Sequence, residues 1–127
     1  MTELDLTRQF IASWETGNID DIIRFCTDDI VYHNIPLEPL YGKEALKAFA
    51  SPLLEMSHEV SWDILAIAQS NDGRVLTERV DRFSIADGKS ITIRVMGIFR
   101  WNTDQLLAEW RDYFDLTEFQ SQLPQAT

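Results

Sequence analysis

Charged side chains interrupt an apolar row in segment 74–85, where the alternation of residue types predicts a β-strand. Every second residue of a strand points to the same face, and the odd-numbered positions here are Val75, Thr77, Arg79, Asp81, Phe83 and Ile85. Both ends of this face are apolar, whereas its centre carries a guanidinium and a carboxylate. A charged group on a face that should be buried says more about function than an apolar group there does, because its burial needs an explanation.

Two further segments place polar groups on faces that are otherwise apolar. Asp112 interrupts the apolar even-numbered face of segment 106–115, and Tyr32 and Asn34 share a face with Ile30. The sequence therefore predicts that five polar side chains point into one core: Tyr32, Asn34, Arg79, Asp81 and Asp112.

Two carboxylates and one guanidinium cannot all be ionised in a dry interior without cost. An unpaired buried charge costs several kcal/mol even after relaxation, and Arg79 can neutralise only one carboxylate. We therefore expect one aspartate to be held protonated, with its pKa raised by burial and by the neighbouring negative charge. A neutral carboxyl group beside a carboxylate provides a general acid and a general base at neutral pH.

Each of these residues also has a purely structural interpretation. Arg79 could form a buried ion pair with one aspartate, since such pairs also perturb pKa values. Tyr32 could be a core aromatic residue with a hydrogen-bonded hydroxyl group, and Asn34 a turn residue at the end of a strand. The catalytic interpretation depends on all of these side chains sharing one interior.

Helices followed by a run of strands are predicted to position these side chains. Apolar residues at helical spacing predict helices at about 5–15, 19–26 and 43–56, with Cys26 on the apolar stripe of the second. Alternation predicts strands at 30–34, 58–69, 74–85, 91–101 and 106–115, and the even-numbered residues of 58–69 share a face. We expect an α+β fold in which a curved sheet forms a cone around the helices, with an apolar cavity at its open end.

Four motifs closely resemble the limonene-1,2-epoxide hydrolase family. They are Tyr32-His33-Asn34 with Ile35-Pro36-Leu37, Glu78-Arg79-Val80-Asp81, Gly97-Ile98-Phe99, and Trp110-Arg111-Asp112-Tyr113-Phe114-Asp115. The resemblance runs from about the second helix to Phe119, and the Arg-x-Asp pair and the last run are its specific parts. It implies a mixed sheet packed on N-terminal helices, the cystatin-like or nuclear transport factor two-like α+β barrel that scytalone dehydratase and ketosteroid isomerase share. It also implies a homodimer and a reaction without metal or cofactor.

The same resemblance implies that the protein hydrolyses an epoxide to a vicinal diol in one step. Asp112 would deprotonate a water molecule that Tyr32 and Asn34 hold by hydrogen bonds. Asp81 would protonate the epoxide oxygen, and Arg79 would bridge the two carboxyl groups. The expected substrate is a small, apolar, cyclic or terpenoid-like epoxide.

Apolar residues near the two aspartates are expected to line the substrate pocket, and one in the tail to close its mouth: Phe83, Ile93, Val95, Phe114 and, at the mouth, Phe119. Two other functions stay open. One is a ketosteroid-isomerase-like or polyketide-cyclase-like enzyme, which needs an aspartate base and an oxyanion-binding pair. The other is a non-catalytic module that holds an apolar ligand.

Length, charge and residue content limit the domain organisation and the partners of the protein. The 127 residues have the size of one domain, so we expect a single domain over residues 1–127. A formal charge of −10 disfavours nucleic acid and anionic membranes as partners. A lone cysteine, Cys26, cannot form an internal disulfide and fits the cytoplasm. No stretch reaches the roughly 20 apolar residues of a membrane span, and His33 and His58 lack the spacing of a zinc site.

Overall fold

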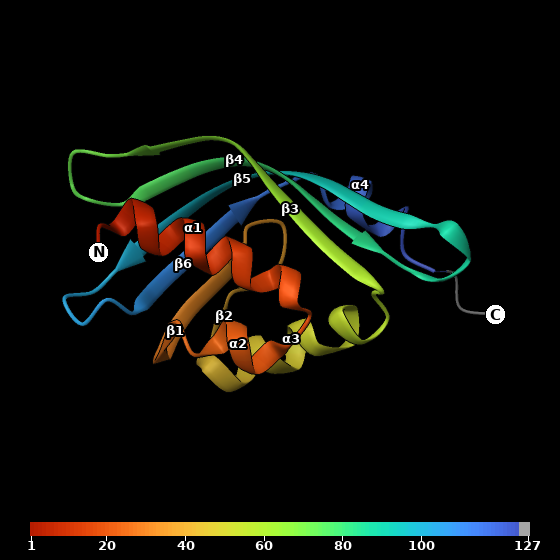
Figure 1. The fold of residues 1–127 in the computed structure, drawn as a ribbon, viewed down its shortest axis with the longest axis horizontal. Coiled ribbons are helices and arrows are strands. Elements are labelled where there is room, and N and C mark those ends of the chain that lie inside the picture. Colours follow the sequence, from red (N-terminus) through yellow and green to blue (C-terminus); the bar gives the residue numbers. More distant parts are fainter. Residues whose placement is uncertain (125–127) are drawn as a thin grey trace.

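The computed structural model describes residues 1–124 (Figure 1). Three of its helices lie in the first 55 residues, a β-meander follows them, and a short fourth helix comes last. The helices are α1 (Glu3–Ser13), α2 (Ile19–Ile23), α3 (Lys43–Glu55) and α4 (Leu116–Gln120), with 3₁₀ turns at Trp14–Thr16 and Ala86–Gly88. The strands are β1 (Cys26–Asn34), β2 (Leu40–Tyr41), β3 (Glu59–Gln69), β4 (Val75–Ser84), β5 (Ser90–Trp101) and β6 (Leu107–Tyr113). None of the helices within residues 1–124 is long and apolar enough to cross a membrane.

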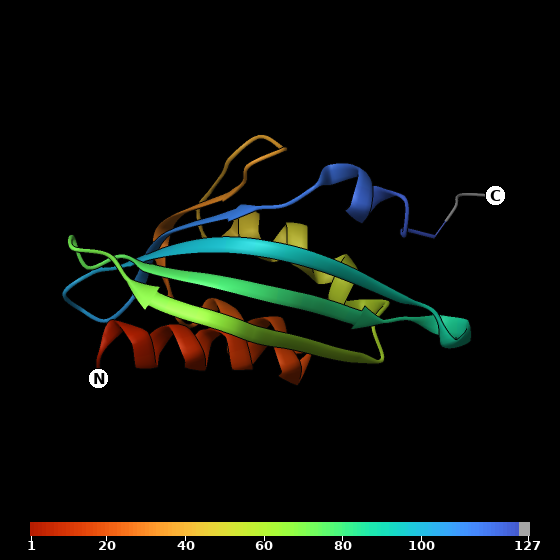
Figure 2. The same cartoon turned by 90° about the horizontal axis from the view of Figure 1, so that it is seen from above.

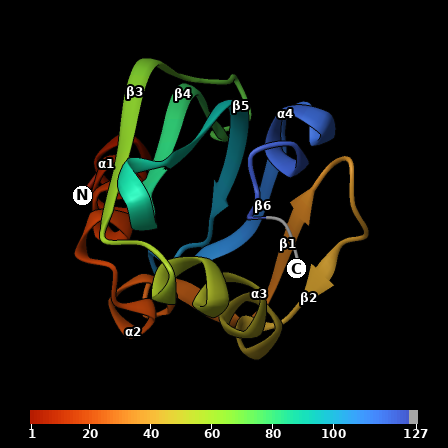
Figure 3. The same cartoon turned by 90° about the vertical axis from the view of Figure 1, so that its right-hand side faces the viewer.

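All six strands form one curved sheet in the order β2-β1-β6-β5-β4-β3. β1 and β6 are parallel, whereas every other neighbouring pair is antiparallel, so the sheet is mixed. Seen end-on, the sheet curves around a concave space, and α1, α2 and α3 cover its open side (Figure 3). The α+β cone predicted from the sequence is confirmed.

Capping residues decide where the first helices begin and end. The hydroxyl group of Thr2 accepts a hydrogen bond from the backbone N–H of Asp5, and the Asp5 carboxylate accepts one from the N–H of Thr2. This reciprocal pair satisfies donors that have no partner inside α1. Gly17, with φ of 71°, ends the turn that follows α1. Asn18 then starts α2 by accepting a hydrogen bond from the N–H of Asp20.

Two bulges change which residues face the core, and the alternation of the sequence did not reveal them. In β3, the register with β4 shifts after Ile64, so Ile67 rather than Ala66 packs against the core. In β6, the register with β5 shifts near its start, and Leu107 rather than Leu106 is buried. A bulge inserts one extra residue, so every side chain beyond it changes face. The bulge in β3 lies opposite Arg79, but its extra residue belongs to β3, so β4 keeps its alternation. The bulge in β6 lies before Glu109, so Asp112 also keeps its predicted orientation.

The first strand begins earlier than the sequence indicated. β1 starts at Cys26, which therefore lies on a strand and not on the apolar stripe of α2. Burial raises the pKa of the Cys26 thiol to about 12, so this side chain is a neutral core group. The two-residue strand β2, which was not predicted, pairs Tyr41 with Val31 of β1.

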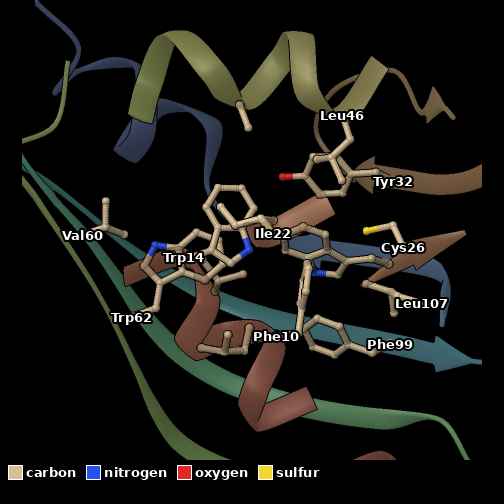
Figure 4. Packing of buried hydrophobic residues seen from close by; sticks show 14 of the residues in the cluster. Phe10, Trp14, Ile22, Cys26, Tyr32, Leu46, Val60, Trp62, Phe99 and Leu107 are labelled. Carbon is tan, nitrogen blue, oxygen red and sulfur yellow. The ribbon is translucent and has the colours of Figure 1, made fainter. Parts of the chain in front are cut away.

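Aromatic rings fill the space between α1 and the sheet (Figure 4). The ring of Phe10 meets those of Trp14, Trp101 and Trp110 edge-on, at centroid distances of 6.5, 6.3 and 5.1 Å. The indole N–H of Trp101 donates a hydrogen bond of 2.9 Å to the hydroxyl oxygen of Thr7. These contacts hold α1 at a fixed distance from the strands that carry the polar side chains.

Candidate active site

A guanidinium held between two carboxyl groups lies at the centre of the sheet. Arg79 donates to both oxygens of Asp81, from Nε at 3.1 Å and from Nη2 at 2.9 Å. It also donates to both oxygens of Asp112, from Nη1 at 3.3 Å and from Nη2 at 2.9 Å. Arg79 is 0% exposed, Asp81 3% and Asp112 4%. The three side chains that the sequence singled out therefore form one buried cluster.

The register of three neighbouring strands brings this cluster together. Arg79 and Asp81 lie two residues apart on the inner face of β4. On β5, Gly97 lies opposite Thr77 of β4 on one side and opposite Asp112 of β6 on the other. The guanidinium of Arg79 therefore crosses over Gly97 to reach the carboxyl group on β6.

Gly97 provides the space for this crossing. A methyl group on its Cα would lie 2.6 Å from Oδ1 of Asp112 and closer still to Nη1 of Arg79. Thr77 completes the environment of the guanidinium, since its hydroxyl oxygen accepts a hydrogen bond of 3.0 Å from Nη1. In the sequence, Thr77 lies on the inward face of its strand and Gly97 belongs to one of the four motifs. Neither was assigned a role, because only the paired register shows what they contact.

The first strand places Tyr32 and Asn34 beside Asp112. In the parallel pairing of β1 with β6, Asn34 lies opposite Asp112 and Tyr32 opposite Trp110. The rings of Tyr32 and Trp110 stack at a centroid distance of 4.3 Å. The indole N–H of Trp110 donates a hydrogen bond of 2.8 Å to Oδ1 of Asp112, a contact that sequence analysis missed. Its signal was present in the sequence, since Trp110 precedes Asp112 by two positions on the same face.

Burial controls the protonation of the polar groups around the cluster. It raises the pKa of Asp81 to about 6, because the carboxylate loses its hydration; Arg79 opposes this rise and Asp112 adds to it. The direction agrees with the sequence-based prediction, but a pKa of about 6 leaves only a minority of Asp81 protonated at pH 7. Arg79 limits the rise, because it donates two hydrogen bonds to this carboxyl group. Burial would by itself lower the pKa of Arg79, but Asp112 and Asp81 outweigh it and raise that pKa, so the guanidinium stays charged.

Burial also keeps the hydroxyl group of Tyr32 neutral. Burial and the nearby Asp112 raise the pKa of Tyr32 above its ordinary value. A neutral phenol can donate a hydrogen bond as well as accept one. Together with the amide of Asn34 and the carboxyl group of Asp112, it can therefore hold a water molecule on the cavity side of β1 and β6.

The polar groups open onto an apolar cavity of about 50 Å³. All five residues predicted to line a pocket contribute to its wall: Phe83, Ile93, Val95, Phe114 and Phe119. Tyr32, Asn34, Asp81 and Asp112 also line it, whereas Arg79 lies behind the two carboxyl groups and does not. Groups of three or more His, Cys, Asp or Glu side chains able to hold a metal ion are absent from residues 1–124.

Side chains from the helical layer complete the wall, and sequence analysis had not assigned them to it. The wall includes Phe49, Ala50 and Leu53 of α3, and Trp14 from the turn that follows α1. Trp62 reaches the same cavity from β3. Trp14 and Trp62 stack at 4.3 Å with an angle of 14° between their rings (Figure 4). The sequence identified these residues only as apolar, since their distance from the aspartates along the chain hides their contact with the same cavity.

Comparison with known proteins agrees with this fold. The family described as "SnoaL-like domain" matches residues 7–110, a range that contains Tyr32, Asn34, Arg79 and Asp81 and ends two residues before Asp112. An LEH-like epoxide hydrolase of M. tuberculosis superposes with a TM-score of 0.79 at 23% sequence identity, over 95% of this chain and 88% of that one.

A second similar structure is SalBIII, described as an epoxide hydrolase/cyclase-like enzyme with a role in pyran ring formation in the polyether salinomycin. It superposes with a TM-score of 0.81 at 12% identity, over 91% of this chain and 92% of that one. At such identities these two likenesses establish the fold alone. The family match covers most of the chain, from α1 to β6. The chain therefore belongs to the SnoaL-like domain family, within the nuclear transport factor two-like superfamily.

Proposed function

We propose that the protein is an epoxide hydrolase that adds water to an apolar epoxide and releases a vicinal diol. The observation that carries this proposal is the buried Asp81–Arg79–Asp112 cluster, whose two carboxyl groups face one apolar cavity. Opening an epoxide requires a proton at the ring oxygen and a deprotonated water at a ring carbon, so an acid and a base must reach one substrate. The motifs that resemble limonene-1,2-epoxide hydrolases and the fold shared with an LEH-like epoxide hydrolase support the same activity.

The reaction proceeds in one step without a covalent bond to the enzyme. Asp112, as a carboxylate, accepts a proton from a water molecule held by Tyr32 and Asn34. The oxygen of this water forms a bond with a ring carbon while the bond from that carbon to the ring oxygen breaks. Asp81, in its neutral form, donates its proton to the ring oxygen, which becomes the second hydroxyl group of the diol.

Arg79 keeps the charge of the cluster constant during this exchange. Asp112 carries the negative charge before the reaction, and Asp81 carries it afterwards. Nη2 of Arg79 lies 2.9 Å from an oxygen of each carboxyl group, so the guanidinium contacts whichever one is ionised. Transfer of a proton from Asp112 back to Asp81, directly or through solvent, restores the starting state.

Hydrolysis in water enriched in oxygen-18 tests this function. Cyclic terpenoid, linear aliphatic and aryl epoxides are incubated with the protein, and the products are separated on a chiral column. We expect a diol from the cyclic, apolar members of the panel, with one labelled oxygen in the diol and none in the protein after a single turnover. Absence of diol from every member of the panel, or label in Asp112, contradicts the proposal.

A hydroxy-epoxide in the same panel tests a second function, formation of a cyclic ether. The shared fold of SalBIII favours this candidate. Asp112 would then deprotonate a hydroxyl group of the substrate in place of water, and Asp81 would still protonate the ring oxygen. The cyclic ether contains no oxygen from the solvent, so mass spectrometry separates it from a diol. A protein that only binds apolar ligands gives neither product.

Activity is expected to fall as the pH rises through the pKa of Asp81, because the general acid must carry its proton. That pKa is raised to about 6, and kcat/KM should fall about tenfold for each pH unit well above it. Initial rates between about pH 5 and pH 9 measure this dependence in the free enzyme, and circular dichroism at each pH confirms that the protein stays folded. A rate that is constant from pH 6 to pH 9 would show that Asp81 is not the acid.

The protein is proposed to act as a homodimer that pairs through the outer face of the sheet. Apolar side chains are exposed there on four adjacent strands: Leu65, Leu76, Met96 and Tyr113. Basic and acidic side chains lie among them, so the face can complement a second copy of itself. Light scattering should give twice the 14.7 kDa mass of the chain, and the double variant Leu65→Glu/Met96→Glu should be monomeric. Tyr41→Glu, at an exposed position on β2, should stay dimeric; a monomeric wild-type protein contradicts the proposal.

A further inference from the structure

One half of β5 has a strand on only one of its two sides. β4 pairs with β5 along its whole length, whereas β6 ends at Tyr113, opposite Met96. Within residues 1–124, the backbone from Ser90 to Val95 therefore has no strand partner on the side where β6 would continue. Figure 2 shows α4 lying beside this half of β5, just beyond the end of β6. An uncovered strand edge exposes backbone donors and acceptors that need partners.

Side chains that follow β6 occupy this edge in place of a strand. The amide of Gln122 makes two hydrogen bonds of 2.8 Å with Thr92, accepting from its backbone N–H and donating to its carbonyl oxygen. Glu118 accepts a hydrogen bond of 3.2 Å from the backbone N–H of Arg94. The guanidinium of Arg94 also donates to Glu118, with Nη2 2.9 Å from Oε2.

These contacts determine where Phe119 lies. Phe119 is the residue of α4 next to Glu118, and it lines the cavity together with Phe114. The two rings meet edge-on at a centroid distance of 6.1 Å. Glu118 and Gln122 thus fasten α4 to β5 on the outer side, while Phe119 reaches the cavity on the inner side.

The contacts that hold α4 against β5 are weak compared with those of the rest of the fold. α4 has five residues and no fully buried side chain. Arg94 is 80% exposed at its side chain, so water competes for its contact with Glu118. Segments with few buried contacts open at a low free-energy cost, and such segments commonly act as covers of active sites.

We propose that Glu118 and Gln122 are specificity-determining residues of this protein. They hold α4 as a cover over the cavity, and the position of Phe119 sets the bulk of the molecule that can enter. The identity of that molecule as an epoxide rests on the proposed function, whereas the control of entry by α4 does not. Glu118 and Gln122 act through Phe119 and do not touch the substrate themselves.

Gln122→Leu tests the cover, because leucine has a similar size and makes neither hydrogen bond to Thr92. Gln120→Leu is the matched control, since Gln120 is exposed at the end of α4, two residues before Gln122. In Gln122→Leu, the backbone N–H of Thr92 should exchange with deuterium about tenfold faster than in the wild-type protein. The control should leave this rate unchanged. An unchanged rate in Gln122→Leu overturns the proposal.

Entry is measured with two unreactive apolar alcohols, cyclohexanol and the bulkier 1-adamantanol, by stopped-flow tryptophan fluorescence. We expect Gln122→Leu and Glu118→Leu to increase the association rate of 1-adamantanol about fivefold or more, and that of cyclohexanol less than twofold. Equal effects on both alcohols, or none, overturn the role in selection. These measurements require no turnover, so a failure of epoxide hydrolysis would leave their outcome intact and would refute only the proposed reaction.

Discussion

Asp112→Asn is expected to lower kcat for diol formation by about 10²- to 10⁴-fold, the range that a positioned general base contributes. The amide oxygen of asparagine can still accept hydrogen bonds from Trp110 and Arg79, but it cannot take a proton from water at neutral pH. Steady-state rates at saturating epoxide, followed by chromatography of the diol, measure the loss.

The variant should keep its fold, because Arg79 retains Asp81 as an ionised partner. The cluster then holds one positive and one negative charge, which is a balanced buried pair. Asp104→Asn makes the same chemical change in the exposed turn between β5 and β6 and should keep the wild-type rate. Wild-type activity in a correctly folded Asp112→Asn protein would exclude Asp112 as the base.

Gly97→Ala is expected to lower both the free energy of unfolding and the rate of diol formation. The added methyl group would lie 2.6 Å from Oδ1 of Asp112 and closer to Nη1 of Arg79, a contact that the packed sheet can relieve only by moving the charged groups apart. Overpacking and the disruption of a buried charge pair should together lower the free energy of unfolding by about 3 kcal/mol or more. Urea denaturation followed by circular dichroism measures this change.

A neighbouring substitution separates crowding at Gly97 from a general effect on β5. Met96 points to the opposite face of the same strand and is 50% exposed. Met96→Ala should shift the urea midpoint little and leave the rate of diol formation close to that of the wild-type protein. If Gly97→Ala matched Met96→Ala in both measurements, the space above Gly97 would not be required for the cluster.

The polar side chains of the site could be located from the sequence because a charge in an apolar strand is a local signal. Arg79 and Asp81 keep the parity of their strand, and the structure buries both of them. Asp112 and Asn34 follow the same rule on β6 and β1. Alternation predicts a face without knowledge of the partner strands, so it identifies the buried polar groups but not the contacts among them.

The remaining features depend on information that is not local. Bulges in β3 and β6 move nearby side chains to the opposite face of the sheet. The alternation of residue types within one strand does not indicate where the extra residue lies. Trp14 reaches the cavity from the helical layer because three-dimensional packing brings it to Trp62. Glu118 and Gln122 lie in a short tail without periodicity, so their contacts with the edge of β5 became evident only from the structure.

The strand order has a consequence for the synthesis of the chain. Among the strands within residues 1–124, β6 is made last, yet it lies between β1 and β5 and joins the β1–β2 pair to the β3–β4–β5 meander. A nascent chain that lacks β6 holds two separate pieces of sheet with an open core between them, and such open edges favour aggregation. Because β6 also carries Asp112, the Asp81–Arg79–Asp112 cluster is complete only after this strand has left the ribosome and paired with β1 and β5.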